Sequence, residues 1–249
     1  MAGDSCIEFD DVVAGYGDFM ILNNLSFKAK RGKITLLLGP NGAGKSTVLK
    51  ALFGMLKVRQ GRIRLDGKDI TGASAKDLLV QHGVAFVPQG RNLFGQLSAY
   101  ENLELGGITL GMKTTRERIP EVLELFPRIK ERLHSAASSL SGGEQKQLEV
   151  GRALLLRPKV ILIDEPSIGL SPLVVRNVFV LLRQLAEAGT TVLMVEQNVK
   201  SALKMADEAI ALESGRLVLH KRADELLADP HIERLFLGGA AALTTSSAA

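Results

Sequence analysis

The chain is poor in the residues that stabilise small secreted proteins and in those that form membrane spans. Its 249 residues include one cysteine, Cys6, and no tryptophan, so no disulfide can form within the chain. We expect Cys6 to be a small filler residue in a reducing compartment. No run approaches the roughly 18 apolar residues that a membrane-spanning helix needs. Any work at a membrane is therefore predicted to pass through partner subunits, with this chain peripheral.

The charge balance is mildly basic but does not indicate a nucleic-acid partner. Lysine and arginine total 31 against 27 acids, a net charge of +4. The basic residues alternate with acids, as around Arg116, Arg118 and Arg128, and no basic block with interleaved aromatic residues occurs. This scatter is typical of solvated helix faces, and we therefore exclude nucleic acid as the expected partner.

The most specific pattern is G-x-x-x-x-G-K-[ST] at residues 39–47. Its members are Gly39, Pro40, Asn41, Gly42, Ala43, Gly44, Lys45, Ser46 and Thr47. The pattern follows an apolar run at 34–38 and precedes helical apolar spacing at 48–56, which is the context of a phosphate-binding loop. Glycines let successive N–H groups point at phosphate oxygens beside a helix N-terminus. Lys45 is expected to reach the β- and γ-phosphates of ATP, and Ser46 to ligate Mg²⁺.

A second glycine-rich motif, Leu-Ser-Gly-Gly-Glu-Gln, occupies residues 140–145 at the head of a periodic stretch that ends before Pro158. Ser141, Gly142 and Gly143 could form another anion site at a helix N-terminus. Taken alone, the motif is better explained as an ordinary serine N-cap.

An apolar run at 160–163 is bounded by Pro158 and Pro166 and ends in two carboxylates, Asp164 and Glu165. Such a run predicts a strand buried on both faces. Beside a phosphate loop, Asp164 is placed to hold Mg²⁺ and Glu165 to polarise an attacking water. The alternative is a solvated acidic loop after a core strand.

These three motifs in this order resemble the ATP-binding subunit of ABC transporters, and the resemblance covers nearly the whole chain. It implies an α/β fold of the P-loop NTPase class, with a RecA-like mixed sheet, an N-terminal antiparallel β-subdomain and an inserted helical subdomain. It also implies that Tyr16 stacks on adenine and that Gln89 senses Mg²⁺ and the γ-phosphate. Each of these two residues, taken alone, could be ordinary packing or a loop amide.

The alternation of strand-like and helix-like segments agrees with one domain over residues 1–249. Strands are predicted at 7–13, 22–29, 62–65, 84–87, 160–163, 190–195 and 209–212, and helices at 116–126, 142–157 and 172–188. We expect a nucleotide-binding core at 1–88 and 158–239, and a helical insertion at 89–157. The small, polar residues 240–249 are expected to be a disordered tail.

Finer features resemble the LivF-type subunit of branched-chain amino acid importers. The segments that carry this resemblance are 87–94, 98–103, 164–172, 195–198 and 237–239. It implies a head-to-tail dimer with a paralogue or a second copy, in which Ser141 and Gly143 of one subunit face the γ-phosphate held by Lys45 of the other. It further implies two membrane permease subunits, a solute-binding protein, and a peripheral place on the cytoplasmic face of the inner membrane.

Three alternatives stay open at this point. The chain could be a soluble ABC ATPase without a permease, for example in iron–sulfur assembly. It could be a nucleotide-gated interaction protein that hydrolyses ATP poorly, although the presence of Glu165 argues for turnover. It could also serve an importer of another small solute such as urea.

Two positions have uncertain roles. Most ABC ATPases carry a γ-phosphate-sensing histidine after the strand predicted at 190–195, whereas this chain has Gln197. We predict Gln197 to be a weaker catalytic sensor, or else a structural amide that caps the next helix. Leu93 and Phe94 are expected to be exposed and to contact a permease helix, the alternative being plain core.

Overall fold

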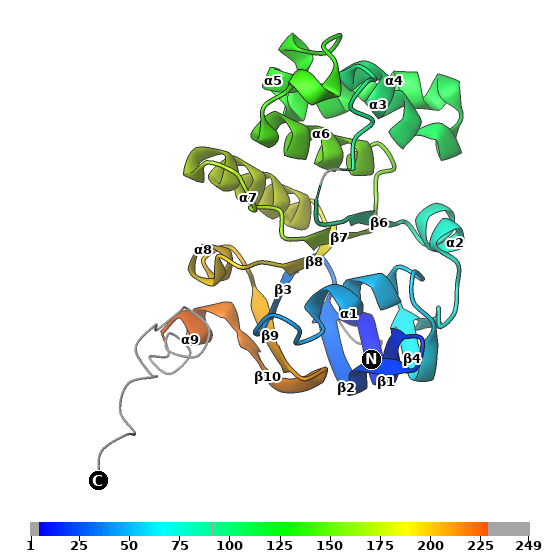
Figure 1. Cartoon of the computed structure of the whole chain (residues 1–249), viewed down its shortest axis with the longest axis vertical. Coiled ribbons are helices and arrows are strands. Elements are labelled where there is room, and N and C mark those ends of the chain that lie inside the picture. The colour runs from blue at the N-terminus through cyan, green and yellow to red at the C-terminus, as the bar shows by residue number, and fades with distance from the viewer. Residues whose placement is uncertain (1–4, 91, 229–249) are drawn as a thin grey trace.

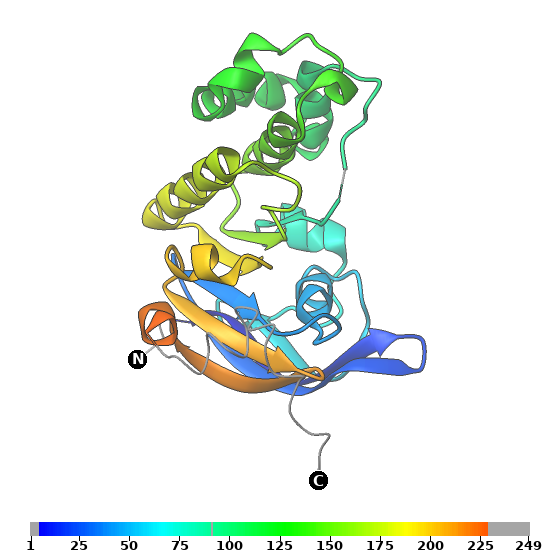
Figure 2. The same ribbon diagram turned by 60° about the vertical axis from the view of Figure 1, so that its left-hand side comes forward.

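The computed structural model describes residues 5–90 and 92–228 and shows two lobes (Figure 1). One lobe contains both sheets, and the other is helical and lies at the far end of the long axis; Figure 2 shows the same separation from a second direction. The tail expected at 240–249 lies outside the described residues. The predicted fold class, an α/β P-loop cassette with an antiparallel β-subdomain and a helical insertion, is confirmed.

A six-stranded sheet forms the centre of the first lobe, in the order β10-β9-β3-β8-β7-β6. Its strands are β3 (Ile34–Leu38), β6 (Val84–Val87), β7 (Val160–Asp164), β8 (Thr191–Val195), β9 (Glu208–Glu213) and β10 (Arg216–Arg222). All pairs are parallel except β9 with β10. Strands β3, β7 and β8 are buried at every residue, as their unbroken apolar runs predict. Their carboxyl ends consequently meet at one edge of the sheet.

The second sheet of this lobe is antiparallel and four-stranded, and contains the N-terminal strands in the order β2-β1-β4-β5. It consists of β1 (Ser5–Tyr16), β2 (Phe19–Lys30), β4 (Val58–Leu65) and β5 (Lys68–Asp69). It shares a buried core with α1 (Lys45–Leu52), in which the rings of Phe9 and Phe27 stack 4.6 Å apart. Cys6 belongs to this core, and burial raises the pKa of its thiol to about 11.

Strands β1 and β2 are longer than the predicted 7–13 and 22–29. Register shifts along β1, with Asp11 and Asn24 at φ near 50°, let the pairing continue through polar residues that break the alternating pattern. Strand β10 was not predicted, because as an edge strand it is mostly exposed and lacks a buried pattern. The Ser214-Gly215 turn before it, with both φ values positive, was the available signal.

The second lobe contains helices and one isolated antiparallel bridge, Ser98 with Ala136, among the residues described between 92 and 157. The helices are α3 (Ala99–Gly106), η1 (Ile108–Leu110), α4 (Met112–Leu125), α5 (Pro127–Glu131), η2 (Ala137–Ser139) and α6 (Gly142–Leu154). Helix α4 begins four residues before the predicted 116, where the Thr115 hydroxyl donates to the Gly111 carbonyl at 2.9 Å. Helix α6 ends before the predicted 157, since Arg157 takes a positive φ of 48°.

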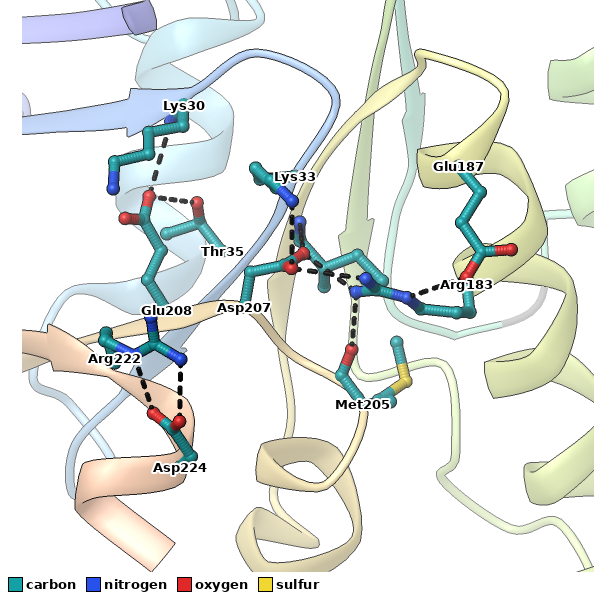
Figure 3. A network of polar contacts seen from close by, with 11 residues as sticks. Lys30, Lys33, Thr35, Arg183, Glu187, Met205, Asp207, Glu208, Arg222 and Asp224 are labelled. Atoms are coloured by element: carbon teal, nitrogen blue, oxygen red, sulfur yellow. Dashed lines mark hydrogen bonds and ion pairs between the residues drawn. The ribbon is translucent and has the colours of Figure 1, made fainter. Parts of the chain in front are cut away.

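The remaining helices flank the first lobe: α2 (Ala75–Val80), α7 (Pro172–Glu187), α8 (Val199–Leu203) and α9 (Ala223–Leu227). A polar network fastens α7 to the sheet, as Figure 3 shows. Arg183 donates to both oxygens of Asp207 at 2.8 and 3.2 Å, and the Ile34 N–H donates to the same carboxylate at 2.9 Å. Burial by itself would raise the pKa of Asp207, but these hydrogen bonds outweigh it and hold the pKa below its ordinary value.

We predict that Asp207→Asn lowers the free energy of unfolding at pH 7 by about 1 kcal/mol, because Arg183 loses its charged partner. The depressed pKa means that this contribution is present above the ordinary carboxyl pKa of about 3.9 and is lost as the pH falls through the folded-state value. Urea unfolding from pH 7 down to pH 3 measures the difference. Asp224→Asn, which breaks an exposed pair with Arg222, is the control; equal effects of the two variants would contradict the prediction.

Candidate functional site

A cavity of about 410 Å³ opens where β3 ends and α1 begins. Its lining comes from segments far apart in the sequence: Tyr16, Ile21, Asn41, Gly42, Gly44, Lys45, Ser46, Thr47, Gln89, Glu165 and Gln197. A larger hollow of about 700 Å³ lies between α7 and α8, but none of the predicted site residues lines it. The chemistry-bearing groups therefore gather at the smaller cavity.

The loop before α1 has the backbone of an anion cradle. Gly42 and Gly44 take φ values of 83° and 100°, which side chains rarely allow, and Gly39 has no room for one: its Cβ would lie 2.3 Å from the Leu212 carbonyl oxygen. Helix α1 begins at Lys45, earlier than the apolar spacing from 48 indicated, so its first-turn N–H groups face the cavity edge. This loop fits the phosphates of a nucleotide.

Lys45 is almost fully buried and bends back over the loop. Its Nζ donates to the Gly39 and Pro40 carbonyls at 2.8 and 3.0 Å. Burial lowers the pKa of Lys45, and the negative charges of Glu165 and Asp164, which by themselves would raise it, offset only part of this effect. An incoming phosphate would offer this ammonium a charged acceptor in place of two neutral carbonyls.

Ser46 and Asp164 meet across 118 positions of sequence. The Ser46 hydroxyl donates to Asp164 Oδ1 at 3.0 Å, and burial raises the pKa of that carboxyl. A hydroxyl, a carboxylate and the amide oxygen of nearby Gln89 are the hard oxygen donors that suit Mg²⁺. No group of three or more His, Cys, Asp or Glu side chains suited to a metal occurs among the described residues. Nucleotide phosphates and water would therefore have to complete such a site.

Glu165 is the point where three segments converge. Its carboxylate accepts from Gln89 Nε2 at 2.6 Å and from Gln197 Nε2 at 3.0 Å on both oxygens. It is 7% exposed, and its backbone has a positive φ of 51° at the end of β7. A solvated acidic loop, the alternative left open by the sequence, is wrong because Asp164 and Glu165 are both buried. A non-glycine residue in this conformation persists only where its surroundings hold it.

Gln197 does not cap the following helix, so that alternative is wrong as well. Asn198 caps α8, accepting the Ser201 N–H on its side chain at 3.3 Å. Glu196 was not predicted from the sequence; it is a buried carboxylate that accepts from the Ser167 hydroxyl at 2.6 Å and the Gln197 N–H at 3.0 Å. Burial raises the pKa of Glu196. A carboxylate directly after a buried strand was the signal for it.

Tyr16 stands at the mouth of the cavity at the end of β1 and is 46% exposed. Lys50 Nζ lies 3.3 Å from the Tyr16 hydroxyl and 5.8 Å from the ring centroid. The ring is thus oriented while much of its surface is free, which suits stacking on a flat ligand. Ile21, which sequence reasoning also missed, lines the cavity beside it.

Ser141, Gly142 and Gly143 do not line the cavity. The Ser141 hydroxyl caps α6 by accepting a hydrogen bond from the Glu144 N–H at 3.3 Å. The Glu144 carboxylate in turn accepts from the Ser141 N–H at 2.8 Å. Figures 1 and 2 show α6 in the helical lobe, well apart from α1. The serine cap favoured from the motif alone is present, and within one chain this motif does not meet the phosphate loop.

Leu93 and Phe94 differ in exposure, although both were expected to be exposed. Leu93 is partly buried against the main core, whereas Phe94 is 54% exposed with the Arg152 guanidinium 5.6 Å from its ring centroid. Across the described helices, none combines the length and apolar character that crossing a membrane requires.

Comparisons with known proteins agree with this geometry. The model of the ABC transporter family matches residues 22–168. The chain is 42% identical over 233 residues to the high-affinity branched-chain amino acid transport ATP-binding protein BraG of Pseudomonas aeruginosa, covering 94% of this chain and 100% of that protein.

Solved structures share the whole fold. A nucleotide-free ATP-binding cassette from an ABC transporter superposes with a TM-score of 0.85 at 27% identity, covering 94% of this chain and 99% of that one. Another ATP-binding cassette, a dimer in a post-hydrolysis state with ADP and phosphate bound, has a TM-score of 0.77 at 27% identity, covering 87% of this chain and 98% of that one. On these matches, and with its motifs converging on one cavity, the chain belongs to the ABC transporter family as an ATP-binding subunit.

Proposed function

We propose that the chain hydrolyses Mg²⁺–ATP at the cavity beside Lys45 and so energises a membrane importer of branched-chain amino acids. The observation that carries the hydrolytic assignment is the buried Glu165 carboxylate, held by the amides of Gln89 and Gln197 at the edge of the phosphate loop. A carboxylate at that place can accept a proton from water attacking the γ-phosphate.

Each of the other groups has a defined part in this proposal. Lys45 leaves its loop carbonyls and binds the β- and γ-phosphates, while the loop N–H groups hold the phosphate oxygens. Ser46, Asp164 and Gln89 would hold Mg²⁺, which would neutralise charge on the phosphates. Tyr16 stacks on the adenine. Gln197 orients Glu165, because it donates to both oxygens of that carboxylate.

A second subunit completes the site in this proposal. The phosphate loop surrounds one side of the nucleotide, and Ser141 and Gly142 are exposed in the other lobe of the same chain. A head-to-tail pair, with itself or a paralogue, would place Ser141 and Gly143 of one subunit against the γ-phosphate bound by the other. The dimeric cassette with ADP and phosphate supports such a pairing.

The proposed solute rests on a relative, and the proposed membrane partners rest on the family resemblance of the motifs. The match to BraG over its full length supports branched-chain amino acids as the solute. Transport would pass through two membrane permease subunits that a solute-binding protein feeds. The chain would then be peripheral on the cytoplasmic face of the membrane. Co-purification with two multi-span proteins tests this proposal; isolation in a stable cytosolic complex would favour a permease-free ATPase instead, and uptake of urea would change the solute.

We predict that Lys45→Ala lowers ATP hydrolysis by at least about 100-fold and weakens nucleotide binding, because the cradle loses its side-chain cation. Steady-state phosphate release and ATP titration measure the two effects. Lys68→Ala, at an exposed position on β5, controls for the loss of a surface charge. Near-normal turnover in the Lys45 variant would remove the phosphate loop from the mechanism.

Glu165→Gln is expected to retain Mg²⁺–ATP binding while hydrolysis falls by about 100-fold or more, since the amide keeps the shape but cannot accept the proton. The variant should accumulate as an ATP-bound dimer on size-exclusion chromatography. Glu213→Gln, at the exposed end of β9, is the matched control. A purely monomeric Glu165 variant would count against self-pairing, and adding the paralogue would then separate pairing from chemistry.

Gln197→Ala should lower kcat by about tenfold to 100-fold with KM for ATP little changed, because Glu165 loses one of its two orienting amides. Gln197→His should hold or raise the basal rate, since an imidazole N–H can make the same contact. Asn198→Ala is the neighbouring control: it removes the α8 cap, costs about 1 kcal/mol of stability and should leave kcat unchanged. A Gln197→Ala variant with normal kcat, in the isolated subunit and in the transporter, would exclude the role.

A further inference from the structure

Helix α6, which begins at the Leu-Ser-Gly-Gly-Glu-Gln motif, binds both polar groups of the Asn92 main chain, shortly after Gln89. The Asn92 N–H donates to Glu149 Oε1 at 2.8 Å, and Arg152 donates to the Asn92 carbonyl at 2.7 Å. Glu149 and Arg152 lie one turn apart on α6, so a single helix face grips this loop residue from two sides.

The acidic half of this grip is buried together with its counter-ion. Lys146 and Glu149 are each 7% exposed, and Lys146 Nζ lies 2.6 Å from Glu149 Oε2. Replacing a buried ion pair by apolar residues is often neutral or stabilising, so stability alone gives little reason for a pair here. Glu149 Oε1 is instead directed at the loop, which gives the pair a positioning role.

A second helix anchors the continuation of the same loop. Asn102 of α3 is fully buried; its side chain accepts from the Phe94 N–H at 2.9 Å and donates to the Phe94 and Ser98 carbonyls at 3.0 Å each. The exposed Phe94 ring lies beside Arg152. Residues 92–98 are therefore fastened to the helical lobe.

The start of the loop belongs to the other lobe. Gln89 donates to Glu165 at 2.6 Å, at the end of the central sheet. Gly90 follows with a φ of 90°, and a Cβ there would meet nothing within 4 Å. The two anchors, one on Glu165 and one on α6, are thus separated by very little chain.

We propose that Lys146, Glu149 and Arg152 are positioning residues that hold residues 92–98 rigidly against α6, so that this segment and the helix move together. This proposal rests on the proposed function, in which the membrane partner contacts the exposed Phe94 ring. A displacement of Phe94 by that partner is passed through Asn92 to α6, and so to Ser141 at the start of that helix. The displacement therefore reaches the Ser141 motif, which completes the nucleotide site of the second subunit, and the Gln89 contact with Glu165 is not needed to convey it.

The test compares two double variants that each keep the charge of the interior balanced. Lys146→Met with Glu149→Leu removes the acceptor for Asn92, whereas Lys146→Gln with Glu149→Gln removes both charges but keeps an amide oxygen for the Asn92 N–H. The control in the same lobe replaces both members of the exposed ion pair on α5, Arg128→Gln with Glu131→Gln.

Amide hydrogen exchange on the isolated full chain reports the grip itself. The Met/Leu variant should exchange the Asn92 amide about tenfold faster than the wild type, with the Phe94 amide unchanged because Asn102 still holds it. The Gln/Gln variant and the α5 control should match the wild type. An unchanged Asn92 amide in the folded Met/Leu variant would overturn the proposal.

ATP hydrolysis then tests the route. Isolated chains of all variants should hydrolyse ATP within about twofold of the wild type, while the assembled transporter with the Met/Leu variant should lose stimulation by the transported solute and the Gln/Gln variant should retain it. Retained stimulation despite fast Asn92 exchange would overturn the route while leaving the ATPase assignment intact. Absence of hydrolysis by the wild-type chain would instead overturn the proposed function.

Discussion

The contact between the Glu165 carboxylate and the amides of Gln89 and Gln197 is the interaction on which the architecture of the site depends. A buried carboxylate is costly unless hydrogen bonds satisfy it, and here the donors come from the ends of two other strands of the sheet. The contact therefore joins the segments after β6, β7 and β8 at one point. It also holds Glu165 at a positive φ, a backbone conformation that an isolated strand end would not keep.

The charges of this site suit the ligand of the proposed function, which carries both phosphate and a divalent cation. Burial disfavours the ionised forms of both Lys45 and Asp164, lowering the pKa of one and raising the pKa of the other. Phosphate offers Lys45 a strong acceptor, and a cation offers Asp164 a positive charge. In the proposed function, each partner would relieve one of the two desolvation costs, which gives a physical reason for nucleotide and Mg²⁺ to bind together.

The two lobes differ in how they are held together. In the sheet lobe, Asp207 binds Arg183 and the first N–H of β3, so α7 and the central sheet form one body (Figure 3). In the helical lobe, Glu149 and Asn102 fasten residues 92–98 to α6 and α3. Between these bodies, the Gln89 contact with Glu165 is a specific polar link, and buried apolar side chains of both lobes pack into one core. A change in the position of one lobe is therefore conveyed to the other through this core as well as through the Gln89 contact.

Local pattern by itself determined the phosphate loop and the strand ending in Asp164 and Glu165, because each rests on residues adjacent in sequence. The fold class was predicted from the family resemblance that the order of the motifs carries. The unbroken apolar runs of β3, β7 and β8 are strong signals that need no long-range information. Edge strand β10 and the short helix α3 gave weak patterns, since an edge strand buries little and eight residues give few periods. Only the tertiary structure decided that Gln197 and Gln89 share one carboxylate, that Asn198 rather than Gln197 caps α8, and that Leu93 is packed while Phe94 is exposed. These outcomes depend on which distant segments meet at the ends of parallel strands. The spacing of residues along the chain does not specify which segments meet.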